Sequence, residues 1–264
     1  MREARFNNRV VIVTGGASGL GQAYCYGFAK EGASIVCSDI NLKGAQQTVA
    51  EIVKMGGKAL AIKTDITKAD EVERMVDETI QAHGKVDVVI NNAGIVSRRG
   101  LLDTTEEVWD SETSVDLKGA FLVTKAVVPH MIQKEYGKIV NISSVLGLIG
   151  VVSPAYTASK AGLIGVTRQW ALEFASYHIC VNCVAPGYIE TPISTEVRQT
   201  VAGRKINQQI PFGWGSVDCV VPVVLFLSSS ESDYITGQCI VVDGGLTSCR
   251  DFGPEYRGFD LEKA

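Results

Sequence analysis

The sequence predicts a doubly wound α/β fold, in which helices cover both faces of a mostly parallel β-sheet. Short apolar segments of strand length alternate with segments of helix length from residue 9 to residue 242, which is the order of repeated β-α-β units. A glycine-rich turn follows the first strand, where folds of this kind bind their ligands. A chain of 264 residues can form one such domain, and we expect residues 1–264 to do so.

Four strands are predicted in the first half of the chain. They cover residues 9–14, 34–38, 58–63 and 86–90. The helix after the first strand ends near Gly32, and Gly56-Gly57 stops the next one after Met55, because glycine is unfavourable inside a helix and frequent at its end. A third helix is predicted over 69–82, and Asn91-Asn92-Ala93-Gly94 follows the fourth strand.

Three further strands in the second half give a sheet of seven. They are predicted over 138–142, 179–184 and 238–242, and Pro186-Gly187 closes the second of them. A helical region over 105–134 divides into two pieces, and other helices cover 154–174 and 217–227. Residues 190–214 are expected to form a substrate lid, and residues 247–264 form a C-terminal tail.

Composition restricts the classes of function. The net charge of −4 and the pI near 5.5 argue against nucleic acid or an anionic membrane surface as partner. No apolar run approaches the ~20 residues of a transmembrane helix. Seven cysteines lie in apolar segments, and Cys180 and Cys183 have no second pair beside them, so we expect reduced thiols rather than disulfides or a metal site. These features favour a cytoplasmic protein.

The glycine-rich turn has the composition of a dinucleotide site. Gly15, Gly19 and Gly21 follow the first strand as G-x-x-x-G-x-G, so the backbone can approach a pyrophosphate at the N-terminus of the next helix. Asp39 ends the second strand, where a carboxylate accepts hydrogen bonds from the adenosine ribose and repels a 2′-phosphate. A tight turn and a helix cap would explain these residues separately, but their joint placement favours a dinucleotide.

One helix carries the residues expected to do the chemistry. Ser153-Pro154 is typical of an N-cap followed by proline at the first helical position, and Tyr156 and Lys160 lie one turn apart on one face. The ammonium favours the phenolate and lowers the tyrosine pKa from its usual value near ~10. Ser143-Ser144 follows the preceding strand and offers a hydroxyl to the reacting oxygen. The pattern predicts proton transfer, although this spacing also occurs on helices without function.

Six motifs follow one another along the chain. They are T-G-G-A-S-G-L-G, N-N-A-G, S-S-V-L-G, Y-T-A-S-K-A-G, V-N-C-V-A-P-G and I-T-G-Q-C-I-V-V-D-G-G. Their content and order resemble the short-chain dehydrogenase/reductase family, and the match extends from about residue 8 to residue 245. The resemblance implies a single-domain Rossmann fold and hydride transfer to or from a nicotinamide cofactor.

The resemblance also assigns roles to residues. Tyr156 would be the catalytic acid/base, Lys160 would lower its pKa and hold the nicotinamide ribose, and a serine would orient the substrate. The residues expected to bind the cofactor are Gly15, Ser18, Gly19, Leu20, Gly21, Asp39, Ile40, Asp65, Ile66, Asn92, Ala93, Gly94, Tyr156, Lys160, Pro186, Gly187, Ile189 and Thr191.

Two positions depart from the family's pattern. Counting thirteen residues back from Tyr156 selects Ser143 as the catalytic serine, whereas aligning S-x-x-G selects Ser144, and we choose Ser144. Asp116 stands where the family usually has a catalytic asparagine. We expect Asp116 to lie near Lys160 and take part in catalysis. In the competing interpretation it points away and pairs with Lys118 or Lys125.

The function expected from these features is the NAD(H)-dependent interconversion of a secondary alcohol and a ketone. Asp39 and Ser18 favour NAD over NADP, because phosphate-binding relatives often carry arginine at the position of Ser18. The alternatives are a reductase of 3-oxoacyl thioesters and a catalytically weak subunit that binds a cofactor. The family resemblance implies a homotetramer. The substrate is a small molecule, and Arg98 and Arg99 offer charge for an anionic one, although such loop residues are commonly only solvated.

Overall fold

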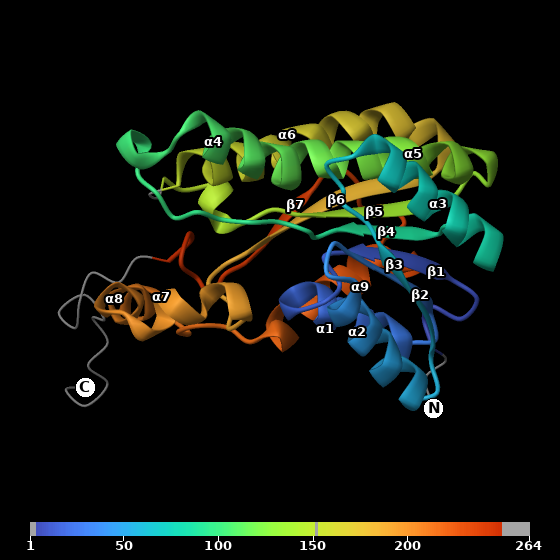
Figure 1. Ribbon diagram of the computed structural model, residues 1–264, viewed down its shortest axis with the longest axis horizontal. Helices are drawn as coiled ribbons and strands as arrows, with labels where there is room; N and C mark the ends of the chain where they lie inside the picture. The colour runs from blue at the N-terminus through green and yellow to red at the C-terminus, as the bar shows by residue number, and fades with distance from the viewer. Residues whose placement is uncertain (1–3, 151–152, 250–264) are drawn as a thin grey trace, which may run out of the picture.

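The computed structural model describes residues 4–150 and 153–249 and contains a seven-stranded sheet, as the sequence predicted (Figure 1). Its strand order is β3-β2-β1-β4-β5-β6-β7, and every neighbouring pair is parallel. The strands are β1 (Val10–Thr14), β2 (Ser34–Asp39), β3 (Lys58–Lys63), β4 (Val88–Asn91), β5 (Gly137–Ile142), β6 (Ile179–Pro186) and β7 (Cys239–Val242).

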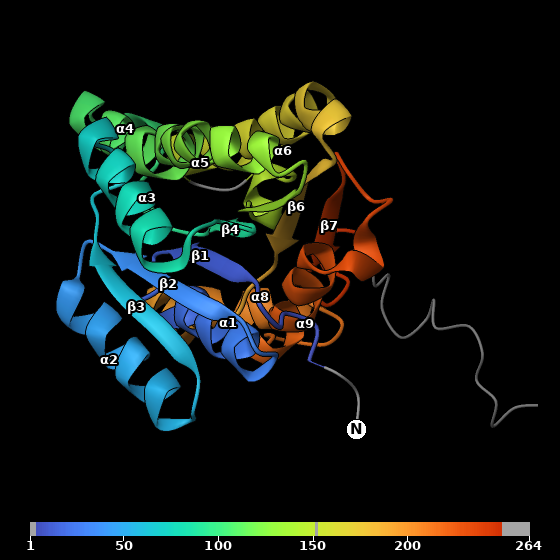
Figure 2. The ribbon, with the colours of Figure 1, turned by 90° about the vertical axis from the view of Figure 1, so that its right-hand side faces the viewer.

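Helices form a layer on each face of the sheet (Figures 1 and 2). The first layer contains α1 (Gly19–Lys30), α2 (Leu42–Lys54) and α9 (Val217–Ser228). The second contains α3 (Ala69–His83), α4 (Glu106–Thr113), α5 (Ala120–Gln133) and α6 (Pro154–Phe174). Among the described helices, none is long and apolar enough to span a membrane.

Alternation along the strands divides the core between the two faces. In β1, Val11 and Val13 pack with α1, α2 and α9, whereas Val10 and Ile12 pack with α3, α5 and α6. All five residues of β1 are buried, because successive side chains of a central strand point to opposite faces and both faces are covered. This burial on both sides explains the continuous apolar runs in the sequence.

The segment predicted as a helix in two pieces is divided by a wider turn. Residues Ser114–Gly119 form a π-helical segment, η2, between α4 and α5. Single π-helical turns within α-helices are frequent at functional sites. Here the wider turn carries the buried Asp116.

Short helices complete the chain. Residues 190–214, predicted as a lid, contain the 3₁₀ turn η5 (Pro192–Ser194) and the helices α7 (Thr195–Gln199) and α8 (Val201–Gln209). The other 3₁₀ turns are η1 (Leu101–Asp103), η3 (Val145–Gly147), η4 (Ala175–Tyr177) and η6 (Ser230–Ser232). Most of the predicted tail, residues 250–264, lies outside the described residues.

The strand order positions the site. From β1 the chain builds outward to β2 and β3 on one side, and then crosses to β4 on the other. Loops at the carboxyl ends of β1 and β4 therefore diverge, and a crevice opens between them. The glycine-rich turn after β1 and the N-N-A-G turn after β4 lie at this crevice.

Candidate active site

A cavity of about 770 Å³ opens at the carboxyl ends of the strands. Every residue that the sequence suggested for cofactor binding contributes to its wall, and so does Ser144. Asp116 does not line the cavity and lies behind Lys160. These residues therefore lie together at one cavity, and their binding of a cofactor stays a prediction. The predicted lid, residues 190–214, contributes Ile193, Val197, Ala202 and Ile206 to the cavity wall.

The glycine-rich turn is packed so closely that its glycines have no space for side chains. Without side chains, its backbone can approach a ligand in the cavity. Gly15 and Gly19 have φ values of 68° and 56°, which glycine adopts readily. A Cβ atom on Gly21 would lie 2.0 Å from the Gly15 carbonyl oxygen, so this contact excludes any larger residue. The turn ends at the N-terminus of α1, whose free N–H groups and dipole favour a phosphate. These residues fit a dinucleotide.

Asp39 lies in the cavity wall at the end of β2. Its Oδ2 accepts a hydrogen bond from the Ala17 N–H at 3.0 Å, and its Oδ1 accepts one from the Asn41 N–H at 2.8 Å. The carboxylate is thus fixed against the glycine-rich turn, where it faces the end of the site expected for the adenosine ribose.

Thr14 holds the turn after β4 against β1. Its Oγ1 accepts hydrogen bonds from the N–H groups of Asn92 at 3.0 Å and of Ala93 at 3.1 Å. The Asn92 side chain donates to the carbonyls of Thr14 at 2.9 Å and of Gly15 at 3.3 Å. These bonds fix the two turns that form the floor of the cavity.

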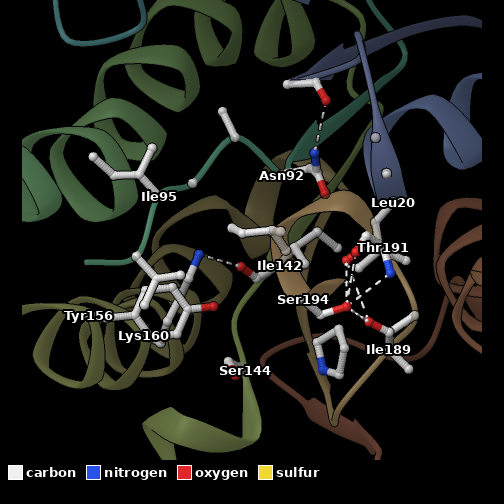
Figure 3. Close-up of a pocket in the computed structure, with 18 of the residues that line it drawn as sticks. Leu20, Asn92, Ile95, Ile142, Ser144, Tyr156, Lys160, Ile189, Thr191 and Ser194 are labelled. Carbon is white, nitrogen blue, oxygen red and sulfur yellow. Dashed lines mark hydrogen bonds between the residues drawn. The ribbon is translucent and has the colours of Figure 1, made fainter. Parts of the chain in front are cut away.

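Tyr156 and Lys160 lie side by side on α6, and the phenol oxygen points into the cavity above Ser144 (Figure 3). The Lys160 Nζ atom is 5.3 Å from the Tyr156 ring centroid and donates a hydrogen bond to the Ile142 carbonyl at 3.1 Å. Lys160 is buried, with 3% of its surface exposed. β5 and α6 therefore bring the three predicted polar residues together.

The two serines at the end of β5 have different surroundings. The Ser143 hydroxyl donates a hydrogen bond to the Lys160 carbonyl at 2.7 Å, and this bond joins the end of β5 to α6. The Ser144 hydroxyl accepts a hydrogen bond from the Leu146 N–H at 3.2 Å, and it acts to lower the pKa of the Tyr156 phenol. Gly147 packs against the backbone of α6, since a Cβ there would lie 2.6 Å from the Lys160 carbonyl carbon. This geometry favours Ser144 as the catalytic serine.

The pKa values differ from the simple expectation. Lys160 does lower the pKa of Tyr156, but burial raises it more, and the net direction is upward. The expectation of a lowered value neglected this loss of solvation. Burial also acts to lower the pKa of Lys160, but Asp116 and Tyr156 outweigh it and the net direction is upward. Lys160 therefore stays an ammonium.

Asp116 faces Lys160, as expected. Its Oδ2 lies 3.8 Å from Nζ of Lys160, and its Oδ1 accepts a hydrogen bond from the Ile95 N–H at 2.7 Å. The interpretation in which Asp116 pairs with Lys118 or Lys125 is wrong. Burial raises the pKa of Asp116 to about 6, although Lys160 and the Ile95 N–H act in the opposite direction.

Two residues were not predicted from the sequence: Tyr188 in the cavity wall, and Glu112 beneath a loop that reaches it. Glu112 is buried on α4, and its Oε1 accepts a hydrogen bond from the Ser97 N–H in the loop after β4. Tyr188 lines the cavity after β6, with its ring 5.2 Å from that of Trp214. Glu112 precedes Asp116 by one helical turn, and this spacing was the available signal.

Several known proteins are similar to this chain in sequence. A family model described as enoyl-(acyl carrier protein) reductase matches residues 15–247. The 3-oxoacyl-[acyl-carrier-protein] reductase FabG of Thermotoga maritima is 42% identical over 244 residues, which are 92% of this chain and 99% of that protein. Cyclopentanol dehydrogenase of a Comamonas species is 37% identical over 247 residues, with 92% and 99% of the two chains covered.

A solved structure is similar over its whole length. It is that of a putative 2-deoxy-d-gluconate 3-dehydrogenase from Agrobacterium tumefaciens with bound NADP, at 35% identity and a TM-score of 0.87. The alignment covers 94% of this chain and 100% of that one. With the cavity and the polar residues at its centre, these matches show that the chain belongs to the short-chain dehydrogenase/reductase family and is an oxidoreductase acting on CH–OH donors.

Proposed function

We propose that the protein interconverts a secondary alcohol and a ketone with NAD(H), and that Tyr156 is its acid/base. The observation that carries this proposal is the convergence of Ser144, Tyr156 and Lys160 on a cavity that also contains the glycine-rich turn and Asp39. Three polar groups at one point provide proton transfer and orientation, and the rest of the cavity has the dimensions and glycine content of a dinucleotide site.

Each residue has a distinct part in the proposed reaction. In alcohol oxidation, Tyr156 accepts the hydroxyl proton, and Ser144 holds the same oxygen by a hydrogen bond. The Lys160 ammonium stabilises the phenolate and, through the Ile142 carbonyl, has a fixed position. The bound nicotinamide would accept the hydride from the carbon. Reduction of a ketone uses the same groups in reverse, with Tyr156 as the acid.

Substitutions separate this chemistry from folding. Tyr156→Phe keeps the packing of the ring and removes the proton donor, so the variant should fold, bind NADH and lose nearly all turnover. Ser144→Ala should lower kcat roughly 10²-fold or more, whereas Ser143→Ala should have a small effect on turnover. The compounds to be tested as substrates are secondary alcohols, polyols, hydroxysteroids and 3-hydroxyacyl thioesters, and turnover is followed by the absorbance of the reduced nicotinamide. More than a few per cent of activity in Tyr156→Phe would contradict the assignment.

The preference for NAD follows from Asp39. Its carboxylate lines the cavity at the end of β2, where we expect the adenosine ribose, and would repel a 2′-phosphate there, while Ser18 provides no positive charge to offset this repulsion. We expect NAD to bind at least about tenfold more tightly than NADP, which is about 1.4 kcal/mol. The similar Agrobacterium structure contains NADP, so the two cofactors need to be compared directly by calorimetry. Asp39→Ala should narrow the difference, and equal affinities in the unaltered protein would contradict this preference.

A second function is favoured by one observation. The Thermotoga maritima relative is a 3-oxoacyl-[acyl-carrier-protein] reductase, and at 42% identity the match covers 92% of this chain. Reduction of an acetoacetyl thioester with higher kcat/KM than any free alcohol or ketone would favour this function. A catalytically weak cofactor-binding subunit is less well supported, because Ser144, Tyr156 and Lys160 are all in place.

We further propose a cytoplasmic homotetramer in which residues 190–214 act as the lid. The seven cysteines are free, which suits a reducing compartment. The lid assignment is supported by α7 and α8, from which Val197, Ala202 and Ile206 line the cavity.

A further inference from the structure

Arg98 brings a cation to the end of the cavity where the substrate is expected. Its side chain lines the cavity with Tyr156 and Tyr188. Its Nη2 donates a hydrogen bond to the carbonyl of Ile193, at the start of the lid. Burial raises the pKa of Tyr156 and of Tyr188, and the charge of Arg98 acts to lower both. Arg98 therefore lines the same cavity as both tyrosines.

The loop that carries Arg98 is anchored from inside. Two buried carboxylates, one helical turn apart, accept hydrogen bonds from alternate N–H groups of this loop: Asp116 from Ile95 at 2.7 Å, and Glu112 from Ser97. Arg98 itself has a φ of 56°, a region that residues with side chains seldom adopt and that clusters at functional sites. The backbone thus holds Arg98 in an unfavourable conformation beside the catalytic tyrosine.

The charge of Arg98 is not neutralised within the described part of the protein. The acids in the cavity wall are Asp39, which ends β2, and Asp65, which lies two residues after β3, at the end of the site expected to bind the dinucleotide. Within residues 4–150 and 153–249, Arg98 forms no ion pair. The adjacent Arg99 is also exposed but does not line the cavity, so a purely solvated role describes Arg99 better than Arg98.

We propose that Arg98 binds a carboxylate of the substrate, so that the enzyme acts on hydroxy acids and their oxo acids. This inference rests on the proposed function and narrows its substrate class. A guanidinium binds a carboxylate through charge-assisted hydrogen bonds, often two in parallel. The Arg98 guanidinium has five N–H donors, and the hydrogen bond from Nη2 to Ile193 uses only one of them. The contact to Ile193 also joins the anion site to the lid, so the same side chain meets both substrate and lid.

The test uses pairs of compounds that differ only in charge. 3-Oxobutanoate is compared with 3-oxobutanamide, and 4-oxopentanoate with 4-oxopentanamide, because the two chain lengths place the carboxylate at different distances from the ketone. Values of kcat/KM with reduced cofactor are measured for the unaltered enzyme, for Arg98→Gln and for Arg99→Gln. Glutamine keeps a hydrogen-bonding side chain without the charge, and Arg99→Gln removes the same charge one residue away.

The unaltered enzyme should prefer at least one acid over its amide by about tenfold or more, as expected for a charge-assisted contact. Arg98→Gln should remove this preference by lowering kcat/KM for the acid at least about tenfold more than kcat/KM for the amide, and Arg99→Gln should retain the preference. Equal losses for acid and amide, or no preference in the unaltered enzyme, would overturn the proposal.

Calorimetry separates this inference from the proposed chemistry. Binding of each acid and amide to the protein with NADH is measured without turnover. Tighter binding of the acid that is lost in Arg98→Gln supports the anion site even if neither compound is reduced, in which case only the proposed reaction fails. If the enzyme instead reduces acids and amides with equal kcat/KM, and Arg98→Gln does not change either value, the proposed reaction is supported and the anion site is excluded.

Discussion

At the scale of single residues, Asp116 combines a buried charge with a position beside the catalytic pair. Only 1% of its surface is exposed, and its Oδ2 has no hydrogen-bond partner among the described residues. Lys160 at 3.8 Å offsets part of the cost of ionising it, but the pKa remains raised to about 6. An asparagine there would keep the acceptor for the Ile95 N–H and remove the charge.

Asp116→Asn is therefore expected to stabilise the protein at neutral pH. Because folding raises the pKa of Asp116, its stabilising contribution is present below the unfolded value near 3.8 and is lost as pH rises through about 6. At pH 7–8 the variant should have a higher melting temperature than the unaltered protein, and its free energy of unfolding should be greater by up to about 3 kcal/mol. Both differences should vanish near pH 4. A stability difference independent of pH would show that ionisation of Asp116 is not its source.

The same substitution tests the catalytic part of Asp116. Its carboxylate acts to raise the pKa of Tyr156, so removing it should move the kcat/KM profile for alcohol oxidation to lower pH. The unaltered enzyme should remain active with the higher optimum. Superimposable profiles of the two forms would exclude Asp116 from the mechanism.

At the scale of elements, the site depends on how closely η3 approaches α6. A Cβ atom added to Gly147 would lie 2.6 Å from the carbonyl carbon of Lys160 and 2.7 Å from the nitrogen of Ala161. Both are backbone atoms and cannot rotate away. This contact places Ser144 opposite Tyr156. It also gives a physical reason for glycine in the S-x-x-G motif, which the sequence analysis used only as a pattern.

Gly147→Ala should therefore separate η3 from α6. We expect a loss of about 1–3 kcal/mol in stability, as for other overpacked sites, together with a fall in kcat, because Ser144 moves relative to Tyr156. Gly150→Ala is the matched control, since an added Cβ there meets no described atom within 4 Å. Chemical denaturation and steady-state kinetics check both variants. Equal behaviour of the two would mean that the close packing at Gly147 has no part in positioning Ser144.

Elements with strong periodicity were predictable from the sequence, and the loop geometry was not. β3 and α6 begin and end close to where the pattern placed them, because apolar alternation and Pro154 mark their limits. Ser153, however, makes no side-chain cap, although the sequence is typical of one. The bonds from Ser97 to Glu112 and from Arg98 to Ile193 join residues 15 and 95 positions apart, and no local pattern encodes such contacts.

At the scale of the whole molecule, two separate surfaces each carry exposed apolar residues that could form interfaces between subunits. On the layer of α4, α5 and α6, Trp109, Phe121 and Leu172 are exposed, and Leu172 exposes 82% of its surface. At the edge of the sheet, β7 carries the exposed residues Ile240 and Val241, and within the described residues it is the last strand of the sheet (Figure 2). Two independent apolar surfaces are what a tetramer of dihedral symmetry needs, since it uses more than one kind of interface.

Light scattering should accordingly give a mass in solution near four times the 28.3 kDa of the chain. Leu172→Glu and Val241→Glu place a charge on one surface each, so each should reduce the mass toward that of a dimer, because burying an unpaired charge at an interface is costly. Val53→Glu is the control, since Val53 is also exposed but lies on α2, away from both surfaces. A monomeric unaltered protein, or tetramers that persist in both variants, would contradict this arrangement. Single-surface variants that remain dimers would show that the other surface assembles independently.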